Sequence, residues 1–480
     1  MKRREFLGLA ARAAASLPAC APFKVVAGKP QKVLVLGAGL AGLVAGYELT
    51  QAGHDVIILE ARAQPGGRIQ TLREPFADGL HAEAGALFVP NNHDLTLRYV
   101  RLFGLSLEPA LPLFEARLFY IRGQRVVSNW GAKVEWPFDL TPEDRELGRL
   151  GMWDKYITDA MAALGNVAAP GWPPHQGLDA LDRMSAAEFL RSRGASPEAV
   201  ALLRVGYLDM LGDGIESYSA LQMLQRLALA QTSGRRSVSH AIRGGTDSLP
   251  KAFAERLAPR IRYDSPVDRI EPGKTSVSVV IGRERLTADH VICTIPFSVL
   301  RNLDVSSSFS PQKARAIEQL PYTSVVRVFL QFSRKAWTAE NLYVLTTTDL
   351  PMTWMYEHTV NQPGSRGILE AQAFGAEARR LARMTEPDRI EYALSQMEQV
   401  FPGVRKDYER GASKSWDEDP WARGAFAYFR PGQMLSFLPH LARPEGRVHF
   451  AGDHTSAWSG WMQGALESGL RAAREVSEAV

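Results

Sequence analysis

The sequence has only two cysteines in 480 residues, Cys20 and Cys293. Two cysteines cannot build a disulfide framework or a cysteine-based metal site. Cys293 lies within an apolar run at 291–295, a setting typical of a buried and unreactive thiol. No spacing of histidines, cysteines or carboxylates suggests a metal site, and no G-x-S-x-G segment indicates a serine nucleophile. The sequence therefore argues against disulfide-rich, metal-dependent and serine-hydrolase classes.

An excess of charge of one sign is also missing. The 56 basic and 52 acidic side chains leave a net charge of +4. There is no long basic block and no basic stripe interleaved with aromatic residues, so nucleic acid is not expected as the main partner. With 45% hydrophobic residues, the chain is long enough for a large core and for more than one domain.

The most informative feature that is present is the segment GAGLAG at 37–42, which directly follows an apolar run at 32–36. An amphipathic stretch and a second apolar run come next. This order is typical of a strand–turn–helix–strand unit that binds a dinucleotide pyrophosphate at the positive end of the helix dipole. Gly37 permits the tight turn, Gly39 lets the backbone approach a phosphate, and Gly42 lets the helix pack closely on the strand.

Glu60 ends the second apolar run, at the position where an acid accepts hydrogen bonds from the ribose hydroxyls of the nucleotide. A carboxylate there disfavours a cofactor with a 2′-phosphate. Shortly afterwards, Arg62, Gly66, Gly67 and Arg68 form an R-x-x-x-G-G-R segment. A nicotinamide site would not need this extension, so it selects among cofactors.

Beyond this unit, which extends to about residue 90, the pattern changes twice. Residues from about 140 to 230 are expected to be helical, with Pro197 in the first turn of one helix, and strands are expected to return after residue 260. The clearest helical periods are at 186–190, 198–203, 220–227 and 464–476, and the clearest strands are at 261–263, 267–270, 276–281, 290–295, 325–330 and 447–453. The return to strands predicts a nucleotide-binding domain assembled from separated segments.

The first twenty-one residues are expected to be a targeting segment. Residues 2–7 (KRREFL) resemble a twin-arginine signal, and the alanine-rich stretch after them is too short for a membrane span. This route exports proteins that have folded around a cofactor, so we expect the mature chain in the periplasm. Cys20 ends an imperfect lipoprotein box, whereas 19–21 is equally a small-residue cleavage site, so lipid-anchored and soluble forms both stay open. The alternative is a basic, disordered N-terminus.

Four separated segments together resemble one family. The C-terminal segment 447–465 (RVHFAGDHTSAWSGWMQGA) is similar to the flavin motif of flavin monoamine oxidases and L-amino-acid oxidases. The glycine-rich start, the G-G-R segment and 82–88 (AEAGALF) complete the set, and WDEDPW at 416–421 adds to it. The resemblance covers essentially the whole chain after the signal. It is specific for cofactor and fold and much less specific for substrate.

The resemblance implies an α/β fold in which a Rossmann-type FAD-binding domain joins a substrate domain of mixed sheet and helices. The expected FAD-binding parts are 30–110, 235–305 and 431–480. The expected substrate-domain parts are 111–234 and 306–430, and the signal occupies 1–21. A small-molecule amine or amino acid is the implied substrate, with no transmembrane span. The oligomeric state stays open, a homodimer included.

The resemblance also implies which residues hold FAD. Arg68 is expected near the flavin or pyrophosphate, Val267 at the adenine through its backbone, Asp453 by the pyrophosphate and ribityl chain, and Trp461 with Met462 at the isoalloxazine. The full set is Gly37, Gly39, Leu40, Ala41, Gly42, Glu60, Ala61, Gly67, Arg68, Gly85, Ala86, Leu87, Val267, Gly452, Asp453, Gly460, Met462 and Ala465.

Monoamine oxidases attach flavin through a cysteine in the segment that matches 424–432. Because Gly424 stands at the matching position, FAD is expected to be non-covalent.

The implied chemistry needs few side chains. A neutral amine places its alpha C–H over flavin N5 and passes a hydride, which leaves an imine that water hydrolyses, and O2 is reduced to H2O2. Trp461 is expected to form one aromatic wall beside the flavin. The second cage tyrosine of monoamine oxidases falls at Ala425, which predicts a half-open wall that admits a bulkier substrate.

Three positions depart from the family pattern. Phe88 stands where L-amino-acid oxidases often have a carboxylate-binding arginine, and Gln372 stands where several of them have a tyrosine. Arg327 replaces a lysine that helps oxygen react in many members. We therefore favour an amine, or an amino acid held differently. Arg327 is interpreted either as a substitute carboxylate anchor or as a strand arginine that points to solvent.

Two further alternatives stay open. The same half-reaction in a dehydrogenase would send electrons to a periplasmic carrier instead of O2. A flavin-binding partner protein without catalysis of its own is the alternative from a different class.

Overall fold

The computed structural model describes residues 29–110, 116–129, 133–169, 171–173, 177–232, 238–305, 309–340 and 345–479. The expected signal segment at 1–21, and Cys20 within it, lie outside the described residues. None of the helices in these ranges is both long and apolar enough to cross a membrane.

A five-stranded parallel sheet forms the centre of the nucleotide-binding half, in the order β10-β2-β1-β14-β22. Its strands are β1 (Lys32–Leu36), β2 (Asp55–Leu59), β10 (Ile261–Arg262), β14 (His290–Cys293) and β22 (Val448–Phe450). The sequence positions confirm that one sheet draws on three distant parts of the chain. Parallel sheets are covered on both faces, which explains the uninterrupted apolar runs in β1 and β14.

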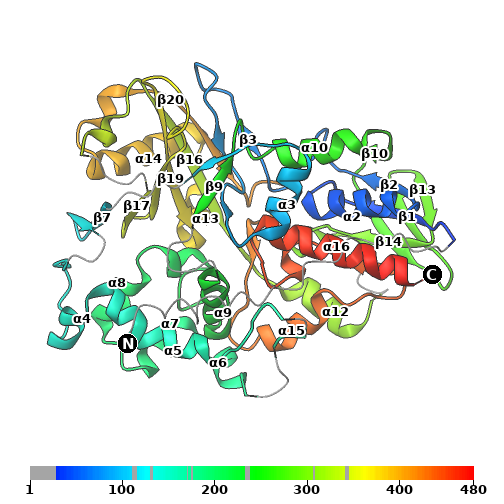
Figure 1. Ribbon diagram of the computed structural model, residues 1–480, viewed down its shortest axis with the longest axis horizontal. Helices are drawn as coiled ribbons and strands as arrows, with labels where there is room; N and C mark the ends of the chain where they lie inside the picture. The colour runs from blue at the N-terminus through cyan, green and yellow to red at the C-terminus, as the bar shows by residue number, and fades with distance from the viewer. Residues whose placement is uncertain are drawn as a thin grey trace, which may run out of the picture.

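Two helices from opposite ends of the chain lie side by side on this sheet, α2 (Leu40–Gln51) and α16 (Met462–Glu478) (Figure 1). Their contact is close because Gly469 has no side chain. A Cβ on Gly469 would lie 2.3 Å from the carbonyl oxygen of Ala41. The N-terminal ends of both helices therefore reach the same edge of the sheet.

A second sheet of seven strands has the order β20-β16-β19-β18-β17-β7-β8. Its strands are β7 (Ala116–Ile121), β8 (Gln124–Asn129), β16 (Val325–Phe332), β17 (Leu345–Thr348), β18 (Trp354–Glu357), β19 (Gly367–Phe374) and β20 (Tyr408–Ser415). Every residue of β16 is buried. The helices α13 (Gly375–Ala382) and α14 (Glu386–Val400) pack on this sheet.

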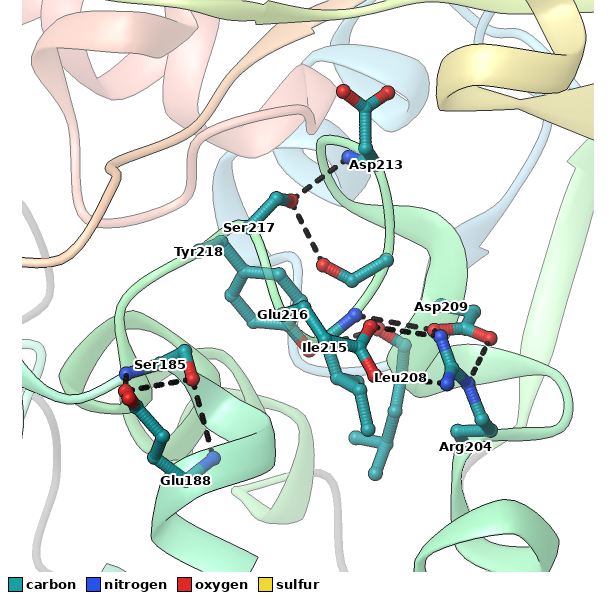
Figure 2. Close-up of polar contacts among 11 residues, drawn as sticks. Ser185, Glu188, Arg204, Leu208, Asp209, Asp213, Ile215, Glu216, Ser217 and Tyr218 are labelled. Carbon is teal, nitrogen blue, oxygen red and sulfur yellow. Dashed lines mark hydrogen bonds and ion pairs between the residues drawn. The ribbon is translucent and has the colours of Figure 1, made fainter.

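A group of helices lies next to the second sheet (Figure 1). Its members are α4 (Pro142–Trp153), α5 (Asp159–Ala162), α6 (Asp179–Arg183), α7 (Ala186–Ser192), α8 (Pro197–Arg204) and α9 (Ala220–Gln231). The connection from α8 to α9 is fixed by Arg204, which bonds both Asp209 and Glu216 at 2.7–3.1 Å (Figure 2). The Tyr218 hydroxyl donates to the Leu208 carbonyl at 2.8 Å, so α9 begins from a fixed turn.

Shorter elements complete the molecule. Two of the small sheets have two strands each: β3 (Thr71–Leu72) pairs with β4 (Ala82–Glu83), and β15 (Tyr322–Thr323) pairs with β21 (Phe426–Ala427). Two others have three strands each. In one, β9 (Ser239–Ile242) lies between β5 (Val89–Pro90) and β6 (Leu107–Pro109); in the other, β12 (Val277–Ile281) lies between β11 (Arg269–Pro272) and β13 (Glu284–Ala288). The remaining helices are α3 (Asp94–Leu102), α10 (Ser248–Arg256), α11 (Phe297–Leu300), α12 (Pro311–Gln319) and α15 (Met434–Leu441).

The fold class is as the sequence predicts, an α/β fold with a Rossmann-type sheet and a second mixed sheet with helices. Strands β1 and β2, helices α7, α8 and α9, and Pro197 in the first turn of α8 appear where expected. Strand β13, the hairpin β7–β8 and strand β20 were not anticipated from the sequence. The expected strand at 267–270 begins only at Arg269. The domain limits themselves stay a prediction.

Lys313 on α12 is fully buried, and this position predicts a pH-dependent stability. Its Nζ donates to the Leu441 carbonyl at 2.9 Å and lies 3.7 Å from the centre of the Phe450 ring. Burial lowers the pKa of Lys313 to about 7, from 10.5. Between these two values the unfolded chain binds more protons than the folded chain, so this residue's contribution to stability decreases as the pH falls from about 10 to about 7.

We expect Lys313→Met to raise the thermal unfolding midpoint relative to the parent more at pH 7 than at pH 9.5. The control is Lys406→Met, at an exposed lysine. Its unfolding midpoint should differ from that of the parent by the same amount at pH 7 and at pH 9.5. A difference between the Lys313→Met protein and the parent that is the same at both pH values would contradict the buried-lysine argument.

Candidate active site

A cavity of about 280 Å³ lies at the carboxyl ends of β1 and β14, where α2 begins. Ligands of open α/β sheets bind at this edge of the strands. Of the site residues predicted from sequence, those on the cavity wall are Gly37, Gly39, Leu40, Ala41, Glu60, Ala61, Gly67, Arg68, Gly85, Ala86, Val267, Arg327, Gln372, Ala425, Gly452, Asp453, Gly460, Trp461, Met462 and Ala465. The structure thus brings residues from five separated parts of the chain to one cavity.

The glycine turn has the geometry that a phosphate site requires. Gly37 has φ +106°, a conformation that favours glycine. A Cβ on Gly42 would lie 2.0 Å from the Gly37 carbonyl oxygen, so Gly42 lies behind the wall and allows α2 to pack against the turn. A Cβ on Gly39 would meet nothing within 4 Å, and no side chain caps the first turn of α2. Open space and unpaired N–H groups therefore meet where a pyrophosphate fits.

Glu60 is buried on the cavity wall, with 5% of its surface exposed. Its carboxylate accepts hydrogen bonds from the backbone N–H groups of Ala38 at 2.6 Å and Arg62 at 2.9 Å. Burial raises the pKa of Glu60, and these hydrogen bonds oppose the shift. The backbone thus fixes the orientation of an acid at the end of β2, as a ribose-binding carboxylate requires.

Arg68 and Asp453 form an ion pair beside the turn. Arg68 also donates to the Ala425 carbonyl at 2.6 Å, and Asp453 accepts from the N–H of Gly460 at 2.9 Å. Burial works to raise the pKa of Asp453, but the charge of Arg68 keeps it below its ordinary value. This pair ties the segment before α16 to the G-G-R segment and to the 425 region.

A second ion-pair group, Arg62–Asp419–Lys414, lies at another part of the wall. Asp419 accepts from Arg62 and Lys414, at 2.6 Å in both cases. Burial works to raise the pKa of Asp419, but Lys414 and Arg62 keep it low. Through this carboxylate, the nucleotide-binding segment is joined to the end of β20.

The aromatic part of the wall includes Trp461 and one residue that was not predicted, Phe426. Trp461 lines the cavity immediately before α16, and the buried His93 meets its ring edge-on with 4.9 Å between ring centroids. Ala425 lines the cavity, and so does the next residue, Phe426, whose Cβ and Cγ would lie 3.4 Å from a Cβ on Gly460. Trp461 and Phe426 are therefore two neighbouring aromatic members of the wall. The half-open wall at Ala425 stays a prediction.

The segment around Ala425 also bears on covalent attachment. Gly424 is not on the cavity wall, whereas Ala425 is, and neither residue has a thiol. Cys293, the cysteine within the described ranges, is buried in β14, and burial raises the pKa of its thiol to about 12. Among the described residues, the wall thus offers no thiol that could form a thioether with a flavin.

Arg327 on β16 lines the cavity, but its charge is already balanced. Its Nε and Nη2 bond both carboxylate oxygens of Glu370 on β19, and Nη1 donates to the Gly85 carbonyl at 2.5 Å. Only 8% of the Arg327 side chain and 2% of the Glu370 side chain are exposed. The interpretation of Arg327 as a strand arginine that points to solvent is therefore wrong.

His358 completes this group, because its Nε2 lies 2.8 Å from Glu370 and its Nδ1 accepts from the N–H of Glu83. Because Nδ1 accepts, Nε2–H is the donor to Glu370, and burial, which lowers the pKa of His358, favours this neutral form. For Glu370, burial works to raise the pKa, but Arg327 and His358 lower it to about 2. The carboxylate therefore stays ionised at any working pH.

Three predicted residues lie off the cavity wall: Gly42, Leu87 and Phe88. Leu87 is buried and follows the wall residue Ala86 in sequence. Phe88 packs edge-on against Tyr356, with 5.5 Å between ring centroids, so no cationic anchor stands there. Gln372 is directly opposite Arg327 in the β16–β19 pairing and does line the cavity.

Several wall residues were missed by the sequence interpretation. Phe426 carries no motif, whereas the WDEDPW segment contained the signal for Trp416 and Trp421. The others are Leu59, Ile69, Ser265, Thr294, Ile295, Pro296, Val299, Leu303 and Val325, while Arg62 and Gly66, also on the wall, belong to the R-x-x-x-G-G-R segment.

Glu370 and His358 are not on the wall, but they hold Arg327, which is. Neither carries a motif, so their role depends on strand pairing.

The fold and this cavity define a dinucleotide-dependent enzyme of the Rossmann class. The chain belongs to the flavin-containing amine oxidoreductases, because the sequence model of that family matches residues 40–477. It is therefore an oxidoreductase that acts on amines, with FAD as a non-covalent cofactor.

Comparisons with individual proteins agree with this assignment. The chain is 32% identical over 471 residues to YobN of Bacillus subtilis (strain 168), which is named as a candidate L-amino-acid oxidase, and the match covers 93% of this chain and 95% of YobN. It is 27% identical to an L-amino-acid oxidase of Bothrops pauloensis, over 94% of this chain and 90% of that protein. The solved structure of cyclohexylamine oxidase from Brevibacterium oxydans IH-35A has a TM-score of 0.82 at 22% identity, over 94% of this chain and 99% of that chain.

The open space at Gly39 allows a direct test of the phosphate position. Gly39 has φ −70°, which alanine adopts without strain, so Gly39→Ala should leave the thermal unfolding midpoint of the FAD-free protein unchanged. The added methyl occupies the space assigned to the phosphates, so we expect the dissociation constant for FAD to rise about tenfold or more, measured by quenching of flavin fluorescence.

Gly42→Ala provides the contrast, because its Cβ collides with protein backbone and should lower the stability of the FAD-free chain itself. Unchanged FAD affinity in the Gly39→Ala protein would show that the phosphates lie elsewhere.

Proposed function

We propose that this enzyme oxidises a substrate amine at the carbon bonded to nitrogen and passes the electrons to O2. The cavity is the observation that carries this proposal, because it runs from the ribose-binding Glu60 to the aromatic residues Trp461 and Phe426. Bound there, FAD would supply the two-electron oxidation: the amine would lose a hydride from its alpha carbon and a proton from its nitrogen, water would hydrolyse the imine to a carbonyl compound and ammonia or an amine, and O2 would be reduced to H2O2.

The side chains of the protein position the substrate and exclude water. Trp461 and Phe426 provide flat apolar surfaces between which an amine is oriented. Gln372 is the neutral polar group next to Arg327 on the wall, and its side-chain amide provides a hydrogen-bonding partner for the nitrogen of the amine. Near these aromatic residues, the described wall holds no unpaired carboxylate for an ammonium ion, so the substrate is expected to react as the neutral amine.

The proposed electron acceptor, O2, does not follow from Arg327. Its guanidinium donates to the Gly85 carbonyl, but the bidentate pairing with Glu370 balances its charge. Arg327 therefore does not by itself select O2 over another acceptor. The competing proposal is a dehydrogenase that passes electrons to a periplasmic carrier, and slow reoxidation in air would favour it.

L-amino-acid oxidation with Arg327 as carboxylate anchor is the second candidate. The names of the relatives from Bacillus subtilis and Bothrops pauloensis favour an amino acid. The bidentate pairing of Arg327 with Glu370 argues against this anchor, because a substrate carboxylate would face Glu370 as well as the arginine.

We also propose export through the twin-arginine route to the periplasm, on the evidence of residues 2–7. The double variant Arg3→Lys/Arg4→Lys should retain the flavoprotein in the cytoplasm. Unchanged fractionation of this double variant would contradict the proposed export.

The main test is anaerobic reduction of the purified holoprotein by a panel of primary amines, secondary amines and amino acids. We expect at least one compound class to bleach the flavin absorbance, with a rate that rises as the pH approaches the pKa of the amine. Each active compound should then yield H2O2 in air in a one-to-one ratio with the carbonyl product. A flavin that no compound reduces would remove the proposal and favour a non-catalytic flavin-binding role.

The role of Arg327 is tested with an Arg327→Met/Glu370→Gln double variant, which removes the ion pair without leaving a buried unpaired carboxylate. Because Glu370 balances the arginine, the reduction rates with L-leucine and with 3-methylbutylamine should change by the same factor. The two substrates differ only in the carboxylate. A loss confined to L-leucine would instead identify Arg327 as the amino-acid anchor.

A further inference from the structure

The arginines on the cavity wall leave no unbalanced cation. Three arginines line the cavity, and each faces a carboxylate, in the pairs Arg62–Asp419, Arg68–Asp453 and Arg327–Glu370. Pairing of this kind lowers the attraction of the wall for an anionic ligand, because each guanidinium already has its counter-charge. Selection for or against an anionic substrate therefore has to come from a charge just outside this wall.

Arg226, on α9, is such a charge. Its Nη1 donates to the Ser459 carbonyl at 3.0 Å, and its guanidinium carbon lies 5.9 Å from the centre of the Phe426 ring. Within the ranges that the structure describes, no carboxylate lies within 4.0 Å of it. Arg226 is only half-exposed. A partly desolvated cation without a counter-charge is stabilised when an anion binds next to it.

Arg226 lies directly beside the aromatic end of the cavity. Its Nη1 would be 3.7 Å from a Cβ on Gly460, the wall residue that precedes Trp461. Its neighbour Phe426 is on the wall as well. The guanidinium is therefore adjacent to both aromatic residues that are proposed to orient the amine.

The backbone fixes this position. The N–H of Ser219, at the start of α9, donates to the Phe429 carbonyl at 2.8 Å, and the N–H of Phe429 donates to the Gln222 side chain at 2.7 Å. Arg226 follows Gln222 by four residues and so lies on the same helix face. The turn before α9 is held by Arg204 (Figure 2). The arginine is therefore presented to the Phe426 region by a rigid support.

We propose that Arg226 binds an anionic group of the substrate and makes amines that carry a carboxylate the preferred substrates. This inference rests on the proposed amine oxidation at the same site. Arg226 acts as a specificity residue, because it contributes a charge-assisted hydrogen bond to the carboxylate and takes no part in the transfer of hydride. The carboxylate is that of an alpha-amino acid or of an amine with a more distant acid group.

The test compares Arg226→Met with the parent holoenzyme on matched substrate pairs. L-Leucine with 3-methylbutylamine, and L-phenylalanine with 2-phenylethylamine, differ by an alpha-carboxylate. 6-Aminohexanoate with pentylamine tests a distant one. We expect kcat/KM to fall about tenfold to a hundredfold for the carboxylate-bearing member of the pair that the enzyme uses. For the neutral member, kcat/KM should stay within about twofold of the parent value.

Arg149→Met is the matched control. Arg149 is also half-buried on a helix, donates to a backbone carbonyl, that of Val205 at 3.0 Å, and lies 5.6 Å from an aromatic ring centre, but it is not near the cavity. In Arg149→Met, the ratio of kcat/KM between the two members of each pair should stay that of the parent. An equal loss for both members in the Arg226→Met protein, or no loss for either, would overturn the proposal.

A binding measurement separates this inference from the proposed function. 3-Phenylpropanoate has a carboxylate but no amine, and its binding to the oxidised holoenzyme can be followed through the flavin spectrum and the thermal unfolding midpoint. We expect the dissociation constant to rise about tenfold or more in Arg226→Met but not in Arg149→Met. If no amine reduces the flavin and this dependence on Arg226 is still found, amine oxidation fails while the anion site stands. If 3-phenylpropanoate binds both variants equally, the anion site fails whatever the turnover.

Discussion

The ion pair between Arg68 and Asp453 is the interaction on which the site depends. It joins residues 385 positions apart, and the same guanidinium also binds the carbonyl of Ala425, 357 positions away. The segments around Arg68, Ala425 and Asp453 are thereby held together at one cavity. Loss of one partner of a buried ion pair typically costs about 3–5 kcal/mol, so Asp453 stays bound to Arg68. Asp453 also accepts from the N–H of Gly460, and this hydrogen bond positions Gly460 and the next residue, Trp461.

The cavity wall extends this principle to its other charges. Arg62 meets Asp419 across the junction of the two halves, and Arg327 meets Glu370 within the second sheet. Each pair lies where water is largely excluded, so its geometry is stiff and its charge has little effect on a distant ligand. A wall of paired charges and aromatic rings suits a substrate that reacts as a neutral amine.

Much of the nucleotide end could be predicted from the sequence, because it is built from backbone geometry that leaves a clear trace. Gly37 requires a positive φ, Gly42 a close approach, and both requirements select glycine. The substrate end was harder. Phe426 was missed because no motif marks it, although it lines the cavity together with Ala425. Glu370 was missed because it contacts Arg327 only as a result of the pairing of β19 with β16, which no sequence motif reveals.

This contrast has a physical origin that explains why fold and cofactor can be assigned more firmly than substrate. Backbone N–H groups, a helix terminus and open space at Gly39 bind a cofactor with little dependence on neighbouring side chains. Near Trp461, by contrast, the ligand would meet side chains from α9, β16, β19 and the 425–426 turn, each placed by a different tertiary contact. A single exchange at any of these positions changes the charge or shape of the site and leaves the sheet intact. This is why we assign substrate choice, as a proposal, to the few charges beside that aromatic pair, of which Arg226 is the one without a counter-charge among the described residues.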